Sequence, residues 1–197
     1  MKTKIVMISG KQGSGKSTLA DSLQGLAREC GYTPYRTRFA KVIYEMHDAV
    51  RDIGHKYGVA YPHKNGPLLQ LLGTELGRNM FGEDVWVNAL KKDIELSTSG
   101  DDKVLVIIDD MRFKNEFDAF TATADTQVYK IRLEASKETR KARCPAWRDN
   151  DTHPSETDLD DYSRGAAFDH LINADKFDQD TVLAIVLRNV FGENYRD

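Results

Sequence analysis

The residues at 10–17 read Gly-Lys-Gln-Gly-Ser-Gly-Lys-Ser, which fits the spacing G-x-x-x-x-G-K-[ST] in full. This run follows an apolar stretch that predicts a strand, and it opens a segment with helical periodicity. Glycines permit positive φ angles and close backbone approach, so successive N–H groups can surround an anion. The run therefore predicts a phosphate-binding loop, in which Lys16 reaches the terminal phosphates of a nucleotide and the Ser17 hydroxyl ligates Mg²⁺. The alternative is an ordinary glycine-rich turn between a strand and a helix.

Two adjacent carboxylates, Asp109 and Asp110, follow the most strand-like run of the chain at residues 104–108. The carboxyl ends of parallel strands meet at the edge where open α/β sheets bind ligands. We therefore expect one of these carboxylates to complete the Mg²⁺ site, partly through water. Both could instead cap the helix that follows. Arg112 is suited either to contact a substrate phosphate or to pair with Glu116 four residues later.

A basic segment and an acidic segment adjoin each other in the second half of the chain. Residues 130–148 contain seven Lys or Arg and two Glu, whereas residues 149–161 contain six acidic residues and no basic one. Arg140, Arg143 and Arg148 are candidates to close over a transferred phosphate, as the residues of a lid do. The acidic segment would then hold the lid by charge pairing. The alternatives are a solvated helix face and a loop that its charges keep soluble.

The elements that must position these residues alternate along the chain. Apolar, strand-like runs alternate with segments of helical periodicity, which is typical of an α/β fold with a mostly parallel sheet. The expected strands are residues 5–8, 35–39, 104–108, 127–133 and 168–173. The expected helices lie near residues 19–30, 43–53, 68–80, 84–98, 113–122, 136–144 and 180–191. We expect a loop at residues 54–67 and a polar, proline-bearing stretch at residues 145–164.

Composition limits the partners. The chain has 197 residues, with 28 Lys or Arg against 31 Asp or Glu and a net charge of −3. This near-balance argues against extended nucleic acid and against a polybasic membrane contact. The sequence has no apolar run of the ~18 residues that a membrane span needs, and we expect no signal peptide. The two cysteines cannot build a disulfide framework, which favours a reducing, cytoplasmic setting.

Other phosphate-loop classes fit the sequence less well. The N-K-x-D sequence with which a GTPase reads guanine does not occur, and no D-x-x-G follows the second expected strand. A helicase or a large motor ATPase normally needs a longer chain. A compact phosphotransferase that acts on a small molecule remains.

Four separated motifs, in order along most of the chain, resemble those of the bacteriophage-type deoxynucleoside monophosphate kinases, which are P-loop proteins built like adenylate kinase. These motifs are the loop at 10–17, Gln70-Leu-Leu-Gly-Thr-Glu-Leu with Trp86-Val87, Asp110-Met-Arg-Phe-Lys-Asn-Glu, and Asn150-Asp-Thr-His-Pro-Ser-Glu. The resemblance implies an α/β, three-layer P-loop nucleoside triphosphate hydrolase fold with a five-stranded parallel sheet, a helical monophosphate-binding region and a short lid.

The resemblance also implies one kinase domain over residues 1–197. Its core would comprise residues 1–40, 100–135 and 165–197, with the helical substrate-binding region near 41–98 and the lid near 136–164. ATP and Mg²⁺ are the implied cofactors.

Family and motifs together give a set of site residues. The expected catalytic residues are Lys16, Arg112, Arg140 and Arg143. The expected ATP-binding residues are Gly10, Gln12, Gly13, Ser14, Gly15, Lys16, Ser17 and Thr18. The expected Mg²⁺ residues are Ser17, Asp109 and Asp110. The expected substrate-binding residues are Lys41, Gln70, Thr74, Arg78, Trp86, Asp110, Arg112, Arg148, His153 and Glu156.

Residue patterns alone leave some of these roles open. Trp86 also fits a core stripe on its helix, and Gly73 with Gly77 also fits close helix packing without a ligand. His153 has no paired ligands at a zinc spacing, so we expect it to form a hydrogen bond within the lid.

The expected reaction is transfer of the ATP γ-phosphate to a (deoxy)nucleoside monophosphate, which gives the diphosphate and ADP. The alternatives are a kinase of another phosphorylated metabolite, similar to the phosphomevalonate kinases, and an ATP-binding module without phosphotransfer. The expected partners are small nucleotides, with no nucleic acid and no membrane, and a homodimer is an expectation at the level of the family. A phage-encoded protein would act in the host cytoplasm.

Overall fold

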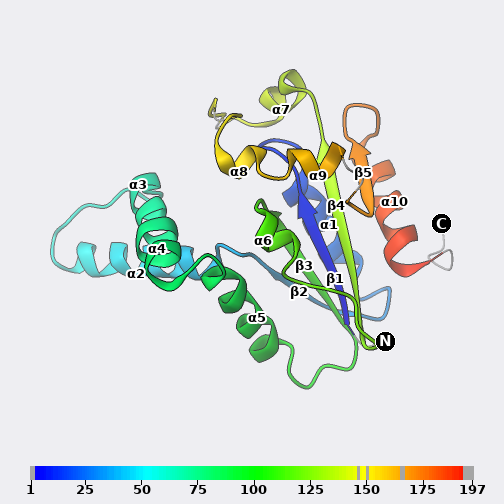
Figure 1. The fold of residues 1–197 in the computed structure, drawn as a ribbon, viewed down its shortest axis with the longest axis horizontal. Coiled ribbons are helices and arrows are strands. Elements are labelled where there is room, and N and C mark those ends of the chain that lie inside the picture. Colours follow the sequence, from blue (N-terminus) through cyan, green and yellow to red (C-terminus); the bar gives the residue numbers. More distant parts are fainter. Residues whose placement is uncertain (1–2, 146, 150, 165–166, 193–197) are drawn as a thin grey trace.

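In the computed structural model, which describes residues 3–145, 147–149, 151–164 and 167–192, one sheet forms the centre of the molecule (Figure 1). The strands of this sheet are β1 (Thr3–Ser9), β2 (Thr33–Thr37), β3 (Val104–Met111), β4 (Thr126–Glu134) and β5 (His170–Asn173). All of their pairings are parallel, and the strand order is β2-β3-β1-β4-β5. The predicted α/β fold with a five-stranded parallel sheet is therefore confirmed.

Helices cover both faces of the sheet and also extend beyond one side of it (Figure 1). The helices are α1 (Lys16–Leu26), α2 (Lys41–Lys56), α3 (Gly66–Gln70), η1 (Leu71–Arg78), α4 (Asn79–Phe81), α5 (Val85–Ser97), α6 (Lys114–Phe117), α7 (Lys137–Arg143), α8 (Pro154–Thr157), α9 (Asp160–Arg164) and α10 (Gln179–Phe191). Helices α2, α3 and α4 lie to one side of the sheet, while α7, α8 and α9 lie across the end at which the strands finish (Figure 1). Within the described residues, none of these helices has the length and apolar character to cross a membrane.

The sheet separates two apolar cores, because successive side chains of a strand point to opposite faces. Val6 and Ile8 of β1 pack in the core that α1 and α10 cover. Ile5 and Met7 pack in the other core, to which α5 and α6 contribute. Strand β3 is buried along nearly its whole length, as its unbroken apolar run predicted. The result is the predicted three-layer arrangement.

The expected helix at residues 68–80 contains a π-helix, η1, at its centre. Trp86 explains this deviation, since its indole Nε1–H donates to the Gly73 carbonyl at 2.8 Å. Gly77 is required beside it, because a Cβ atom there would lie 2.3 Å from the indole ring. A carbonyl that accepts from a side chain disturbs the regular ladder of an α-helix. Periodicity alone could not predict this detail.

Other boundaries differ modestly from expectation. Strand β2 begins two residues earlier than the apolar pattern suggested, and α6 is a single turn rather than a helix over 113–122. The expected loop at 54–67 is shorter, because α2 continues to Lys56. The polar stretch at 145–164 contains α8 and α9. His153 caps α8 by accepting the Ser155 N–H, and Pro154 takes the first helical position, where a missing N–H costs nothing.

Candidate active site

The predicted phosphate loop lies between β1 and α1, as its sequence context required. Gly13 and Gly15 have φ angles of +78° and +99°, a region that residues with side chains rarely adopt. A Cβ atom at Gly13 would also lie 2.4 Å from the Arg140 carbonyl oxygen. The glycines therefore satisfy both the loop conformation and the close approach of α7. The loop ends where α1 begins, so the helix N-terminus adds partial positive charge.

Lys16 is folded back onto its own loop. Its ammonium group donates to the carbonyl oxygens of Gly10 at 2.6 Å and Lys11 at 2.9 Å. The pKa of Lys16 is lowered to about 7, chiefly by burial and also by the nearby Arg112, although Glu156 and Asp109 act in the opposite direction. An anion in the loop would favour the charged ammonium, so the site is arranged to receive negative charge.

Two cavities meet at this loop and share Gly13, Lys16 and Ser17 in their linings. The first, of about 660 Å³, extends toward α10, and the second, of about 600 Å³, extends toward α2 and η1. A ligand in either cavity would thus reach the same lysine. This arrangement leaves two separate spaces, one on either side of the predicted phosphate-binding loop.

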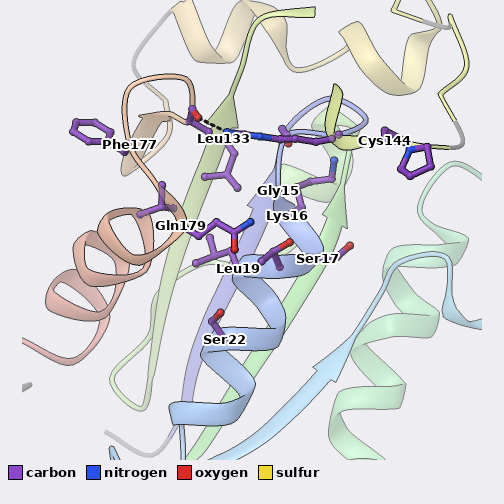
Figure 2. A pocket seen from close by; sticks show the side chains of 16 residues that line it. Gly15, Lys16, Ser17, Leu19, Ser22, Leu133, Cys144, Phe177 and Gln179 are labelled. Atoms are coloured by element: carbon purple, nitrogen blue, oxygen red, sulfur yellow. Dashed lines mark hydrogen bonds between the residues drawn. The ribbon is translucent and has the colours of Figure 1, made fainter. Parts of the chain in front are cut away.

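The first cavity has a largely apolar wall (Figure 2). Leu133 and Phe177 line it together with Val182, and Figure 2 shows Leu133 between Phe177 and the start of α1. Arg143, a predicted catalytic residue, also lines this cavity and donates from Nη2 to the Ala174 carbonyl at 2.9 Å. Such a wall suits a flat, weakly polar group such as a purine ring.

Most of the predicted substrate-binding residues line the second cavity. They are Gln70, Thr74, Arg78, Trp86, Asp110, Arg112 and His153. Trp86 is only 5% exposed and is hydrogen-bonded to η1, so it forms part of the cavity wall. This position fits the interpretation of Trp86 as a core residue. Residues from η1, β3 and the lid, which are far apart in the sequence, thus surround one space.

Three predicted substrate-binding residues are placed elsewhere. Lys41 turns inward to the carboxylate of Asp93, an ion pair that raises the pKa of the lysine, and it also donates to the Tyr35 hydroxyl at 3.2 Å. It therefore does not line the second cavity. Arg148 is exposed near the start of α3, and Glu156 of α8 is buried. The motif pattern identified the segments but not the direction of each side chain.

Asp109 and Asp110 both line the second cavity, but they do not cap the following helix. Asp109 is 5% exposed and accepts from the Nε of Arg36 at 3.1 Å. Asp110 accepts from the backbone N–H groups of Phe39 and Ala40 at 2.9 and 3.1 Å, and burial raises its pKa. Asp109 therefore connects β3 to β2, and Asp110 connects β3 to the segment between β2 and α2.

The donor set at this end of the sheet fits Mg²⁺. The hydroxyl of Ser17 and the carboxylates of Asp109 and Asp110 line one cavity, and oxygen donors of this kind suit a small, hard cation. Within the described residues, by contrast, no group of three His, Cys, Asp or Glu side chains could hold a metal ion by itself. A bound cation would thus depend on the phosphates of a ligand for part of its coordination.

Two arginines of the site were not predicted. Arg36 forms ion pairs with Asp109 and with Asp21 of α1. The Nε of Arg38 lies 3.4 Å from Oδ1 of Asp109. Arg38 lines the second cavity with 48% of its side chain exposed. The signal that could have found them is their position at the carboxyl end of β2, because this strand ends at the same edge as β3.

Arg140, a predicted catalytic residue, is buried against the phosphate loop rather than directed into either of the two cavities. It is 4% exposed and donates to the carbonyl oxygens of Gln12 at 3.2 Å and Ala135 at 3.1 Å. Its remaining donors reach both carboxylate oxygens of Asp151 at 2.9 and 2.7 Å. All three nitrogens are thus engaged within the protein, and the residue connects α7 to the phosphate loop and to Asp151.

The basic and acidic segments are paired, as one of the predicted alternatives required. Lys137 pairs with Asp149, and Arg140 pairs with Asp151. Asp160 of α9 also pairs with Lys11 of the phosphate loop, at 3.2 Å. Asn150, which belongs to the motif of this region, lies outside the described residues. The acidic segment therefore holds α7, α8 and α9 over the phosphate loop.

Comparison with known proteins supports the fold. No protein-family model and no curated protein matches this chain. Among solved structures it is similar to shikimate kinase from Acinetobacter baumannii in complex with shikimate. That match has 14% identity and a TM-score of 0.50 and covers 100% of this chain and 97% of that one. APS kinase from Mycobacterium tuberculosis in complex with AMPPNP and APS matches with 14% identity and a TM-score of 0.46, over 94% of this chain and 96% of that one. The chain has the α/β fold of the P-loop kinases, with a parallel five-stranded sheet and flanking helices.

Proposed function

We propose that this protein is a nucleoside monophosphate kinase that transfers the γ-phosphate of ATP to a deoxynucleoside monophosphate. The observation that carries this proposal is the meeting of two cavities at Lys16. A transfer between two small molecules requires two binding places that share one phosphate-binding centre. The fold supports phosphotransfer, and the four motifs support a nucleotide as the acceptor.

The donor would occupy the first cavity, with its base against the apolar wall near Phe177 and its phosphates on the N–H groups of the loop. The acceptor would occupy the second cavity, with its phosphate near the guanidinium groups of Arg38 and Arg112. The α2–α5 region at 41–98 would thus bind the acceptor, and residues 136–164 would form the lid. Lys16 lies between the two and would neutralise charge on the transferred group.

Ser17 and the Asp109–Asp110 pair would hold Mg²⁺, which when bound supplies charge neutralisation to the phosphate oxygens. No general base is needed, because a phosphate monoester has its second pKa near ~6 and is largely dianionic at neutral pH. Catalysis would therefore consist of placing two phosphates in line and compensating their charge. The arginines and the lysine that line the cavities can supply this charge compensation.

A panel of acceptors tests the proposal. ADP release would be measured with ATP and dAMP, dGMP, dCMP, dTMP or hydroxymethylated dCMP, and with ribonucleotides, phosphomevalonate and shikimate as the other acceptors. We expect turnover that depends on a deoxynucleoside monophosphate and is lost in Lys16→Ala, whose circular dichroism stays unchanged. Turnover only with phosphomevalonate or shikimate would show another metabolite kinase. Slow hydrolysis that no acceptor stimulates would show a non-catalytic ATP-binding module.

A further inference from the structure

Glu156 connects the lid to the phosphate loop from a buried position. Its side chain is only 2% exposed, although it belongs to the single-turn helix α8, which lies across the end at which the strands finish (Figure 1). One carboxylate oxygen, Oε2, accepts from the backbone N–H of Gln12 at 2.8 Å. The other oxygen, Oε1, accepts from Nη1 of Arg112. A buried carboxylate that uses both oxygens in this way joins three segments that are distant in the sequence.

The backbone of Arg112 is fixed independently of Glu156. Glu116 accepts from the N–H of Arg112 at 2.7 Å and from the N–H of Phe113 at 3.1 Å. The orientation of the Arg112 side chain therefore depends on its own torsions and on what its guanidinium contacts. Those contacts are Glu156 and the Ser155 carbonyl at 3.2 Å, and both are made by Nη1.

The other donors of Arg112 remain available to a ligand. Among the described residues no partner is found for Nε or Nη2, and 31% of the side chain is exposed where it lines the second cavity. A guanidinium held at one nitrogen presents its remaining N–H groups in a fixed fork, which suits the oxygens of a phosphate. Nη1 thus serves as the anchor, and Nε and Nη2 as the binding face.

The charge of Glu156 also allows two cations to share this space. Arg112 lies close enough to Lys16 to lower the pKa of the lysine, and Glu156 acts on the same pKa in the opposite direction. Without the carboxylate, the two cations would repel each other in a partly buried site. The longer and more exposed arginine side chain would then turn toward solvent.

We propose that Glu156 is a positioning residue that holds Arg112 against the phosphate loop, with the free guanidinium donors directed into the second cavity. This inference rests on the proposed function, and it replaces the prediction that Glu156 itself contacts the substrate. The opposite role would be competition, in which the carboxylate occupies the place of a substrate phosphate. Removing the charge of Glu156 should weaken the use of the acceptor if the residue positions Arg112, and should improve acceptor binding if it competes with the substrate phosphate.

The variant Glu156→Gln separates the two contacts. Its amide keeps one oxygen that can accept from the N–H of Gln12, but it cannot also offer a charged oxygen to Arg112. We expect kcat/KM for the acceptor to fall more than about tenfold, while KM for ATP changes less than about threefold. The matched control is Asp161→Asn, which removes an exposed carboxylate of the same acidic segment. A lower acceptor KM in Glu156→Gln would show competition and overturn the proposal.

A double variant tests whether the effect passes through Arg112. In an Arg112→Ala background, adding Glu156→Gln should change kcat/KM by less than about twofold, because residues that act as one unit are not additive. If the two losses multiply, Glu156 acts by another route and the proposal is wrong. Thermal unfolding of each variant identifies any loss that is due only to incomplete folding.

A measurement on the ligand-free protein separates this inference from the proposed function. The heteronuclear NOE of the Arg112 Nε–H group reports how rigidly the side chain is held. We expect it to fall in Glu156→Gln and to stay unchanged in Asp161→Asn. An unchanged value in Glu156→Gln would refute the positioning role even if the enzyme is active. A wild-type protein that phosphorylates no acceptor would refute the proposed function but leave this result to stand.

Discussion

Glu116 should make the stability of this protein depend on pH in an unusual direction. Its side chain is 5% exposed, and burial raises its pKa from 4.5 to about 7, with Asp110 adding to the rise. Two backbone N–H groups and Arg78, whose Nη2 lies 3.6 Å from Oε1 of Glu116, only partly offset this cost of burying the charged carboxylate. The perturbation that isolates the effect is Glu116→Gln, because an amide keeps an oxygen for the two N–H groups but does not ionise.

The sign of the effect follows from proton linkage. An acid whose pKa is higher in the folded state binds more protons when folded, so its burial costs little below the unfolded pKa of 4.5. The cost then grows as the pH rises through 4.5 toward 7. A pKa shift of this size lowers the free energy of unfolding by about 3 kcal/mol once the pH is well above the folded pKa. About 2 to 3 kcal/mol of this loss occurs between about pH 5 and about pH 8. Glu116→Gln should therefore gain stability relative to the wild type across this interval.

Urea unfolding of both proteins near these two pH values measures the effect. The free energy of unfolding contains contributions from every titrating group, but the difference between the two proteins retains mainly that of Glu116. Asp118→Asn, which alters an exposed carboxylate of the same turn, is the matched control. A difference between wild type and Glu116→Gln that stays constant within about 0.5 kcal/mol from about pH 5 to about pH 8 would refute the reasoning.

Two further substitutions probe the first cavity and η1. Arg143→Ala should lower kcat more than about tenfold if Arg143, on the cavity wall beside the Ala174 carbonyl, closes on the transition state, whereas an unchanged rate would return it to a solvated surface role. Gly77→Ala should lower the free energy of unfolding by about 1 to 3 kcal/mol, because its methyl group would lie 2.3 Å from the Trp86 ring. Gly25→Ala in α1 is the control, since nothing lies within 4 Å of its new methyl group and the helix should gain up to about 1 kcal/mol. Equal melting temperatures for the two alanine variants would contradict the packing argument.

The sequence predicted the parts of the site that follow from backbone context. The loop at 10–17 and the carboxylates after β3 lie at strand ends, and in a parallel sheet all strand ends on one side form one edge. Once the alternation of strands and helices is recognised, their proximity follows. The arginines at the end of β2 satisfy the same argument, so Arg36 and Arg38 could have been found by applying it to every strand.

Side-chain direction could not be predicted in the same way. The basic helix α7 has two arginines, and the packing of its backbone against Gly13 decides that Arg140 faces inward. Lys41 was expected to bind the substrate, whereas in the structure it pairs with the carboxylate of Asp93 in α5. In both cases a partner of the long charged side chain lies on a distant segment, which a single sequence does not identify.

The strand order determines when this site can form during synthesis. Thr3 in β1 pairs with Val104 in β3 and with Thr126 in β4, so the first strand meets its neighbours only after about a hundred further residues exist. Closing such long loops costs entropy before any contact is gained, and parallel pairings of this kind form slowly. The phosphate loop leaves the ribosome early but is connected to a strand that lacks both partners. The proposed nucleotide site therefore cannot form in a nascent chain until β3 and β4 have emerged, and ligand binding to the growing chain would report the completion of the central sheet.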